Sequence, residues 1–288
     1  MRLPLSLSAV ILRIIPLLVT VGFSAQATDK PAIVSAGAGI SDIIESLGAA
    51  ELLIGVDSTT QLKNERDLPV IGYHRQLSAE GILSLKPSHL IGSDAMGSKD
   101  TLNILKRSGV EVISFESGGG VAGLKKRIRQ LGEITGTKFQ AEKISEDVDK
   151  QLAGLKRGAL NQRGLFLLVH AGRSPSVGGN DTTADQIIAL MGAENAANDI
   201  NGYKPISGEA IAALQPDFIL VSQRGKPAEK KQTQLLRLLP TLSLTPAVKN
   251  NAVYNLNSRA LLGGLSLLSL AEASRLQNSI GTGPGTAH

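Results

Sequence analysis

Short apolar runs alternate with segments of helical periodicity over residues 32–115. The apolar runs predict five strands, at residues 32–36 (AIVSA), 52–56 (LLIGV), 68–72 (LPVIG), 89–93 (HLIGS) and 110–115 (VEVISF). The segments between them predict three helices, at residues 41–48, 78–85 and 99–109. Ser41 is the expected N-cap of the first helix and Gly48 its expected end. Strands that alternate with helices are typical of βαβ units with a mainly parallel sheet.

The same alternation returns after residue 164. It predicts strands at 164–172, 217–222 and 251–256, and helices at 182–192, 207–214, 231–239 and around 267–277. The stretch GYHRQLSAEGILSLKPSHLIGS (72–93) is similar to GYKPISGEAIAALQPDFILVS (202–222). The chain therefore indicates two similar α/β lobes, although the shared βαβ pattern alone could also produce this match.

A helical region separates the two lobes. Leu124, Ile128 and Leu131 recur at helical spacing, and the spacing returns at Ile144, Val148, Leu152 and Leu155. A helix over residues 139–157 would be about 28 Å long at 1.5 Å per residue. We expect one long rigid helix between two lobes with mainly parallel central sheets, and a ligand cleft between the lobes. The predicted parts are an N-terminal lobe (28–122), a helical linker (123–160) and a C-terminal lobe (161–288).

The first 27 residues have the composition of a secretory signal. Arg2 and Arg13 precede an apolar core of about ten residues, Ile14 to Phe23, which is too short to span a bilayer. The segment ends in Ala25-Gln26-Ala27, a spacing of small residues that predicts cleavage after Ala27. A membrane anchor is the alternative. No cysteine occurs in the chain, which excludes a lipid-modified cysteine, disulfides and thiolate metal sites. We expect a periplasmic monomer that is not a lipoprotein.

The charge of the chain is modest once this segment is set aside. The whole sequence has a formal net charge of +5, and the segment contains two of the 30 basic residues and none of the 25 acidic ones. Basic residues are scattered and aromatic residues make up 3%, so we expect no nucleic-acid partner. A mildly positive protein suits a small acidic ligand better.

The signal, the two similar lobes and the connecting helix resemble the helical-backbone class of periplasmic substrate-binding proteins of ABC importers. The block Gly-Tyr-x-Arg-x-Leu-Ser-x-Glu-Gly-Ile-Leu from residue 72, and the segment LVHAGRSPSVGGNDTTADQII from residue 168, resemble the periplasmic haem-binding proteins of the HmuT type. This resemblance implies that Tyr73 ligates haem iron and that His170 faces the cleft. It also implies that haem is a transported ligand and that the partner is an inner-membrane ABC permease with its cytoplasmic ATPase.

The residues themselves fit this chemistry. A tyrosine phenolate is a hard anionic oxygen ligand for ferric haem, and a free phenol with a pKa of about 10 needs nearby positive charge to bind in this form. In an extended segment Arg75 lies on the same side as Tyr73, where it can stabilise the phenolate or pair with a haem propionate. His74 then points away. It is a candidate for the cleft wall, and a ligand role is not favoured.

Further candidates lie in the second half of the chain. His170 follows an apolar strand, and strand ends at a cleft are good ligand positions, so it is a candidate iron ligand on the same haem or on a second one; the alternative is a hydrogen-bonded structural histidine. Arg173 and Arg259 are candidates for propionate contacts or simply solvated charges. Tyr203 matches Tyr73 in the repeat but lacks the following arginine, so it is a candidate for the cleft wall only.

Glu80 and Glu209 occupy matching positions in the two lobes. The resemblance implies that they dock onto arginines of the permease. Ser78 and Ser207 stand where helix N-caps are expected, and a glutamate in the first helical turn suits the helix dipole. The two roles, permease docking and stabilisation of the helix N-terminus, are compatible.

Three other functions compete with haem transport. A ferric siderophore or cobalamin carrier is the main alternative, although the absence of tryptophan speaks against aromatic packing of cobalamin. A bare zinc or manganese carrier would need several histidines and a carboxylate at one site. An enzyme is not expected, because no nucleophile and base occur at a recognisable spacing.

Overall fold

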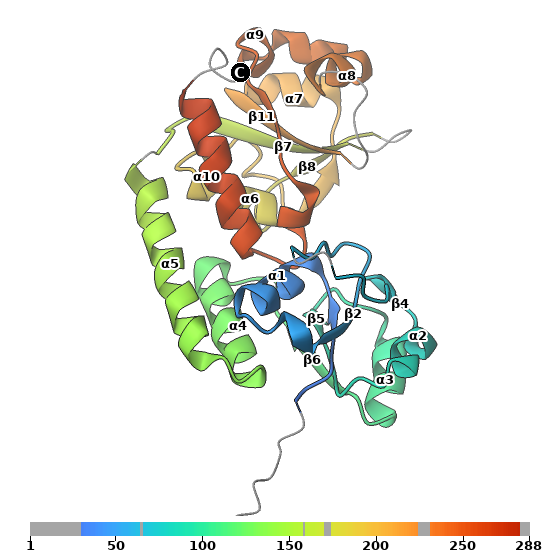
Figure 1. The fold of residues 1–288 in the computed structure, drawn as a ribbon. Helices are drawn as coiled ribbons and strands as arrows, with labels where there is room; N and C mark the ends of the chain where they lie inside the picture. The colour runs from blue at the N-terminus through green and yellow to red at the C-terminus, as the bar shows by residue number, and fades with distance from the viewer. Residues whose placement is uncertain (1–29, 64–65, 158, 170–173, 224–230, 283–288) are drawn as a thin grey trace, which may run out of the picture.

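The computed structural model describes residues 30–63, 66–157, 159–169, 174–223 and 231–282. The expected signal segment and its cleavage site lie outside the described residues, as do His170 and Arg173. Two α/β lobes lie one above the other, with helices running between them along one side (Figure 1). Within the described ranges no helix is both long and apolar enough to cross a bilayer.

The N-terminal lobe contains a four-stranded parallel sheet in the order β2-β1-β5-β6. Its strands are β1 (Ile33–Ala36), β2 (Leu53–Val56), β5 (His89–Ser93) and β6 (Glu111–Phe115). Its other elements are α1 (Ala38–Ser46), the 3-10 turn η1 (Ala50–Leu52), the hairpin of β3 (Gly72–Tyr73) and β4 (Gln76–Leu77), α2 (Ala79–Ser84) and α3 (Lys99–Arg107). The predicted parallel sheet is confirmed, because the pairs β1–β2, β1–β5 and β5–β6 are all parallel.

Two predictions for this lobe are wrong. The run at 68–72 forms no central strand; Val70 only bridges Val56, and the chain then enters the β3–β4 hairpin. Ser41 is not an N-cap, since α1 begins three residues earlier, after Gly37, whose φ of 127° few other residues adopt. The Ser41 hydroxyl is instead buried and bonds to the hydroxyl of Ser35 on β1 at 2.8 Å.

The C-terminal lobe contains a larger, mixed sheet in the order β10-β8-β7-β11-β12, with β9 paired to β7. Strands β7, β9, β11 and β12 are parallel, and β8 and β10 form an antiparallel edge. Their bounds are β7 (Arg163–Val169), β8 (Ser176–Gly178), β9 (Glu194–Asn195), β10 (Tyr203–Pro205), β11 (Phe218–Gln223) and β12 (Val253–Asn255). The helices are α6 (Thr183–Leu190), α7 (Gly208–Leu214), α8 (Lys231–Leu238), α9 (Pro246–Lys249) and α10 (Leu267–Gly281), with 3-10 turns η2 (Pro240–Leu244) and η3 (Ser258–Leu261).

Two helices follow the N-terminal lobe in the chain, α4 (Gly120–Ile134) and α5 (Lys138–Arg157). The second has 20 residues, close to the helix that the apolar spacing predicts. It packs on α4 at one end, while Leu155 at its other end joins the core of the C-terminal lobe. A helix of this length is about 30 Å long, so it links the two lobes as one stiff element.

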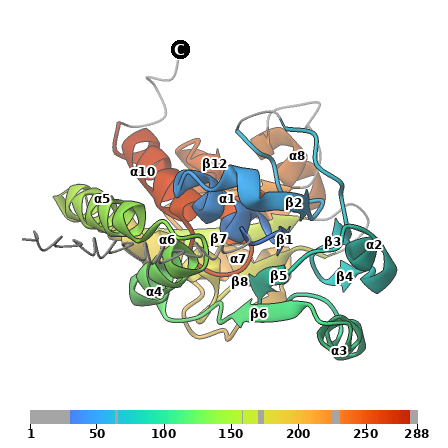
Figure 2. The same ribbon diagram turned by 60° about the horizontal axis from the view of Figure 1, so that its bottom comes forward.

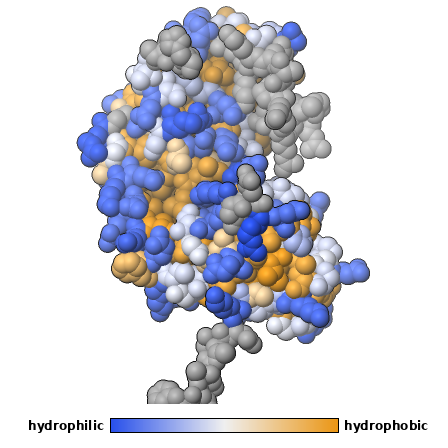
Figure 3. Space-filling view, in the orientation of Figure 1, coloured by the Kyte–Doolittle hydropathy of each residue, from blue (hydrophilic) through white to orange (hydrophobic). Residues whose placement is uncertain are grey.

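The C-terminal helix α10 adds a second inter-lobe contact that the sequence did not predict. It packs on α1 of the N-terminal lobe and on α6 of the C-terminal lobe, as well as on α5. Leu270 belongs to the core of the first lobe and Leu276 to that of the second. In both ribbon views α4, α5 and α10 lie on the same side of the molecule (Figures 1 and 2), and apolar side chains gather between α5 and α10 on the surface in Figure 3.

The loop before α10 lies directly on the N-terminal lobe. The buried Arg127 of α4 donates from Nη1 to the carbonyl oxygen of Glu116 at 2.9 Å and from Nη2 to the carbonyl oxygen of Leu265. Gly264 has a φ of +84°, and a Cβ there would stand 2.0 Å from the carbonyl oxygen of Ser117. The two lobes are therefore in backbone contact at this point, and only glycine fits.

Candidate functional site

Tyr73 lies on the short β3–β4 hairpin, with His74 and Arg75 in its turn. Gly72 makes the hairpin possible, because it has a φ of +100° and a Cβ there would come within 2.9 Å of the Gln76 carbonyl oxygen. The Gly72 carbonyl oxygen also accepts a 2.8 Å hydrogen bond from the backbone N–H of Ser58. The hairpin is thereby tied to the loop that follows β2, at the carboxyl edge of the parallel sheet.

A cavity of about 330 Å³ lies between the lobes beside Tyr73. The N-terminal lobe contributes Ser58, Thr59 and Tyr73, and the C-terminal lobe contributes Ser258, Arg259 and Leu262. Its volume is at the lower end of the range of small-molecule sites. Its lining combines a phenol, a guanidinium and hydroxyl groups, which suits a ligand with acidic groups.

A larger cavity of about 420 Å³ lies elsewhere, between β6 and α4 of the N-terminal lobe. None of the ligand candidates from the sequence lines it. We therefore take the smaller inter-lobe cavity as the candidate site, because it brings together residues from both lobes.

Arg259 is held in the cavity wall by the backbone of η3. Its N–H donates to Oδ1 of Asn257 at 3.0 Å, and its Nη1 donates to Oε1 of Gln61 from the other lobe. Its Nε is buried and has no hydrogen-bond partner among the described residues. The guanidinium thus has donor capacity left over next to Tyr73.

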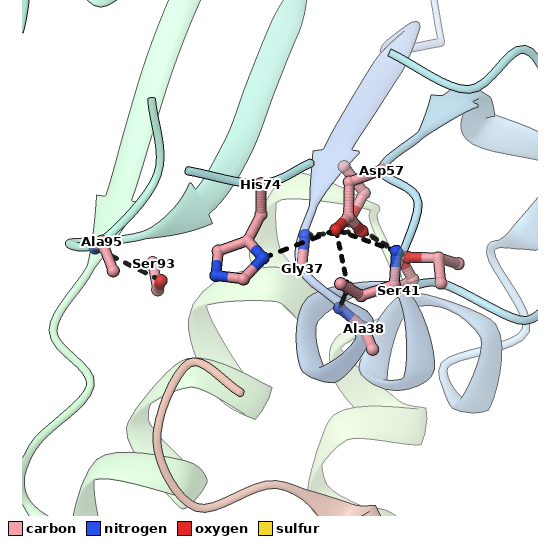
Figure 4. A network of polar contacts seen from close by, with 10 residues as sticks. Gly37, Ala38, Ser41, Asp57, His74, Ser93 and Ala95 are labelled. Carbon is pink, nitrogen blue, oxygen red and sulfur yellow. Dashed lines mark hydrogen bonds and ion pairs between the residues drawn. The ribbon is translucent and has the colours of Figure 1, made fainter. Parts of the chain in front are cut away.

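His74 lies behind the cavity wall and is only 2% exposed. Its ring centroid is 4.2 Å from that of Tyr73, with the ring planes at 58°, and its Nδ1 is 3.7 Å from Oδ2 of Asp57 (Figure 4). The sequence suggested that the His74 side chain forms part of the cleft wall. The structure places it one layer deeper, since the hairpin turn directs its side chain into the lobe.

Asp57 is a buried carboxylate that the sequence reasoning missed. It is fully buried and accepts hydrogen bonds from the backbone N–H of Gly37 at 3.1 Å and from the hydroxyls of Thr59 and Thr60 at 2.6 and 2.9 Å. Burial alone raises the pKa of this carboxyl, but the nearby His74 imidazole and the hydrogen bonds from Thr59 and Thr60 outweigh it, so the pKa is lowered overall. An acidic residue directly after the carboxyl end of β2 was the available signal.

Arg75 and Tyr203 approach each other from the two lobes. Arg75 is exposed at the hairpin turn, and its positive charge lowers the pKa of the Tyr203 hydroxyl slightly. Burial of that hydroxyl has the larger effect and raises its pKa, while hydrogen bonding with Ala184 and Thr182 partly offsets the rise. The Tyr203 ring packs edge-on against Phe166 at 6.2 Å. The hydrogen bonds direct the hydroxyl to the start of α6.

Glu80 and Glu209 are exposed in the first turns of α2 and α7, one on each lobe. The predicted N-caps are confirmed, since the Ser78 hydroxyl accepts from the N–H of Gly81 at 3.1 Å and that of Ser207 from the N–H of Ala210 at 3.2 Å. Hydrogen bonds from its own backbone N–H and from Ser207 lower the pKa of Glu209, which is therefore anionic at neutral pH.

Comparison with known proteins places this geometry in a family. A family model described as periplasmic binding protein matches residues 33–260. The chain belongs to the periplasmic binding protein family. The match runs from β1 into η3, so it includes most of both lobes and every residue of the inter-lobe cavity lining except Leu262.

Individual members of the family are closely similar. The crystal structure of the periplasmic heme-binding protein HutB of Vibrio cholerae is 42% identical, with a TM-score of 0.81 over 86% of this chain and 98% of that one. A periplasmic heme-binding protein from Pseudomonas aeruginosa is 31% identical, with a TM-score of 0.80 over 88% and 93% of the two chains. An uncharacterised ABC transporter substrate-binding lipoprotein of Bacillus subtilis, YvrC, is 25% identical over 78% of this chain and 72% of its own. The two-lobe α/β fold and the resemblance to this class are both confirmed.

Proposed function

We propose that this protein captures ferric haem in the cavity between its lobes and delivers it to an ABC importer without chemical change. The observation that carries the proposal is the position of Tyr73, on the wall of an inter-lobe cavity with Arg259 opposite. The 42% identity to a protein described as a periplasmic heme-binding protein supports it. The family consists of binding proteins, so haem is the cargo rather than a catalytic cofactor.

In this proposal Tyr73 binds the iron as phenolate. Ferric iron is a hard cation, and tyrosine is an established axial ligand of haem. Arg259, with its unpartnered Nε, and Arg75, exposed at the same hairpin, supply positive charge for the phenolate and for the two haem propionates. His170 and Arg173 remain proposals for a second iron ligand and a propionate contact, and both lie outside the described residues.

The proposed partner is a membrane permease with its ATPase. Glu80 and Glu209 are exposed on separate lobes, so one permease surface can contact both. The protein would be exported, with residues 1–27 removed by cleavage after Ala27, and would work as a periplasmic monomer. A lipid-modified cysteine would not anchor it, because the sequence has no cysteine.

An absorption spectrum tests the proposal. Purified protein titrated with ferric haem should develop an intense Soret band that saturates at a defined ratio. A Tyr73→Phe variant should lose the absorption band that arises from phenolate-to-iron charge transfer. A protein that binds a ferric siderophore or cobalamin and gives no haem spectrum would contradict the proposal.

A further inference from the structure

Asp57 is the point where three segments of the N-terminal lobe meet. Its Oδ1 accepts from the N–H of Gly37, at the start of α1, and from the Thr60 hydroxyl. Its Oδ2 accepts from the N–H and the hydroxyl of Thr59 at 3.1 and 2.6 Å and faces Nδ1 of His74. The carboxylate thus connects the β1–α1 loop, the loop after β2 and the hairpin that carries Tyr73.

Two of these connections lead straight to the cavity. Thr59 lines the cavity, and its hydroxyl also accepts a 3.2 Å hydrogen bond from the N–H of Ala38. His74 packs its ring against the ring of Tyr73, which lines the same cavity. A change at the buried carboxylate would therefore reach both the polar wall and the phenol, although Asp57 itself is fully buried.

The His74 imidazole is directed at the carboxylate of Asp57. Figure 4 shows one ring nitrogen directed at Asp57 and the other toward the side on which Ser93 lies. Nδ1 is buried, has no hydrogen-bond partner within the described part of the chain, and lies 3.7 Å from the Asp57 carboxylate, which is an ion-pair distance. Of the polar groups around it, the Asp57 carboxylate is the one that Nδ1 faces, so electrostatic attraction favours this orientation of the ring. The backbone of His74 is also fixed, because its carbonyl oxygen accepts from the N–H of Gly97 at 2.8 Å.

We propose that Asp57 and His74 are positioning residues for Tyr73: the buried carboxylate fixes the imidazole, and the imidazole fixes the plane in which the phenol meets the ligand. This inference rests on the proposed function. Neither residue contacts the ligand. Groups that orient a metal ligand from behind typically affect affinity roughly 10- to 100-fold.

The test uses the full-length exported protein loaded with ferric haem. Asp57→Asn keeps the shape of the side chain but removes its charge and part of its acceptor capacity. His74→Phe keeps an aromatic ring against Tyr73 but removes Nδ1. Each variant should raise the haem dissociation rate about tenfold. Each should also shift the phenolate-to-iron charge-transfer band. The double variant should show no more than the larger single effect, because both residues act through one ring.

A matched control separates positioning from general destabilisation. Asp217 accepts a 2.8 Å hydrogen bond from the N–H of Arg163 in the other lobe, away from the cavity. Asp217→Asn should lower the melting temperature and leave the haem spectrum and dissociation rate unchanged. If Asp57→Asn does not fold, the His74→Phe variant alone tests the positioning role.

The outcomes are distinct. Wild-type spectrum and dissociation rate in His74→Phe, or in a folded Asp57→Asn, would overturn the positioning role. Failure of the wild-type protein to bind haem would overturn the proposed function instead, and would be seen before any variant is compared.

Discussion

Arg259 of the C-terminal lobe donates a hydrogen bond to Gln61 of the N-terminal lobe beside the cavity that Tyr73 lines. The partner of this guanidinium is a neutral amide, and no carboxylate is paired with it among the described residues. An anionic partner can replace this neutral amide favourably, because a carboxylate adds charge–charge attraction and can accept two parallel hydrogen bonds from the guanidinium. We therefore expect the Arg259 side chain to leave Gln61 when an acidic ligand enters.

This exchange predicts opposite behaviour for the two partners. Arg259→Gln should weaken haem binding about 10- to 100-fold, the range for a lost hydrogen bond to a charged group. Gln61→Ala should leave the affinity equal or slightly higher, because the arginine then has no competing partner. Titrations followed by absorbance measure both. Equal loss of affinity in the two variants would mean that the hydrogen bond between Arg259 and Gln61 supports binding, and not the charge of Arg259 acting on the ligand.

Of the hairpin residues, Tyr73 should contribute most to the affinity of the protein for haem. Tyr73→Ala should weaken haem binding and change its spectrum much more than His74→Ala, because the first removes the iron ligand and the second only a residue behind it. Tyr73→Phe is the sharper variant, since it keeps the ring against His74 and removes one oxygen. Identical spectra for wild type and Tyr73→Phe would remove Tyr73 from the iron.

The two exposed glutamates should affect transport and not binding. Glu80→Ala combined with Glu209→Ala should leave haem affinity unchanged and abolish uptake in cells that carry the cognate permease. Glu142, exposed on α5, supplies a matched control, and Glu142→Ala should transport normally. Normal uptake by the double variant would leave the glutamates with a helix-terminal role only.

Acid should weaken the network around Asp57. The pKa of this carboxyl is lowered in the folded protein, so Asp57 contributes stability that is complete well above its unfolded pKa of about 4 and is lost as the pH falls below that value. Asp57→Asn should therefore destabilise the protein more at pH 7 than at pH 3. Urea unfolding at the two pH values measures the difference; an equal loss at both would show that the charge of Asp57 contributes nothing.

The sequence predicted most of the fold because its signals are local. Residues 89–93 and 110–115 are apolar runs between helices of clear periodicity, and both became strands of the parallel sheet. The antiparallel edge formed by β8 and β10 was missed, since Tyr203, Lys204 and Pro205 are exposed and show no apolar pattern. Edge strands are defined by their pairing partner, which a single segment does not reveal.

The site was predictable only in part, for a related reason. The block of Tyr73, His74 and Arg75 could be recognised from its unusual composition, and Tyr73 does line the inter-lobe cavity. The contact of His74 with Asp57 joins residues 17 positions apart through the fold. Nor does periodicity show that α10 touches both lobes, because its apolar residues serve two different cores.

Gly264 has a consequence for how the protein can be altered. Its Cα lies so close to Ser117 that a single added methyl group would collide with the backbone of the other lobe. Any side chain at position 264 would therefore force the contact between the two lobes to shift, because the atoms it meets belong to backbone and not to a flexible side chain. A single methyl group at this glycine would thus be enough to disturb how the halves of the protein sit on each other.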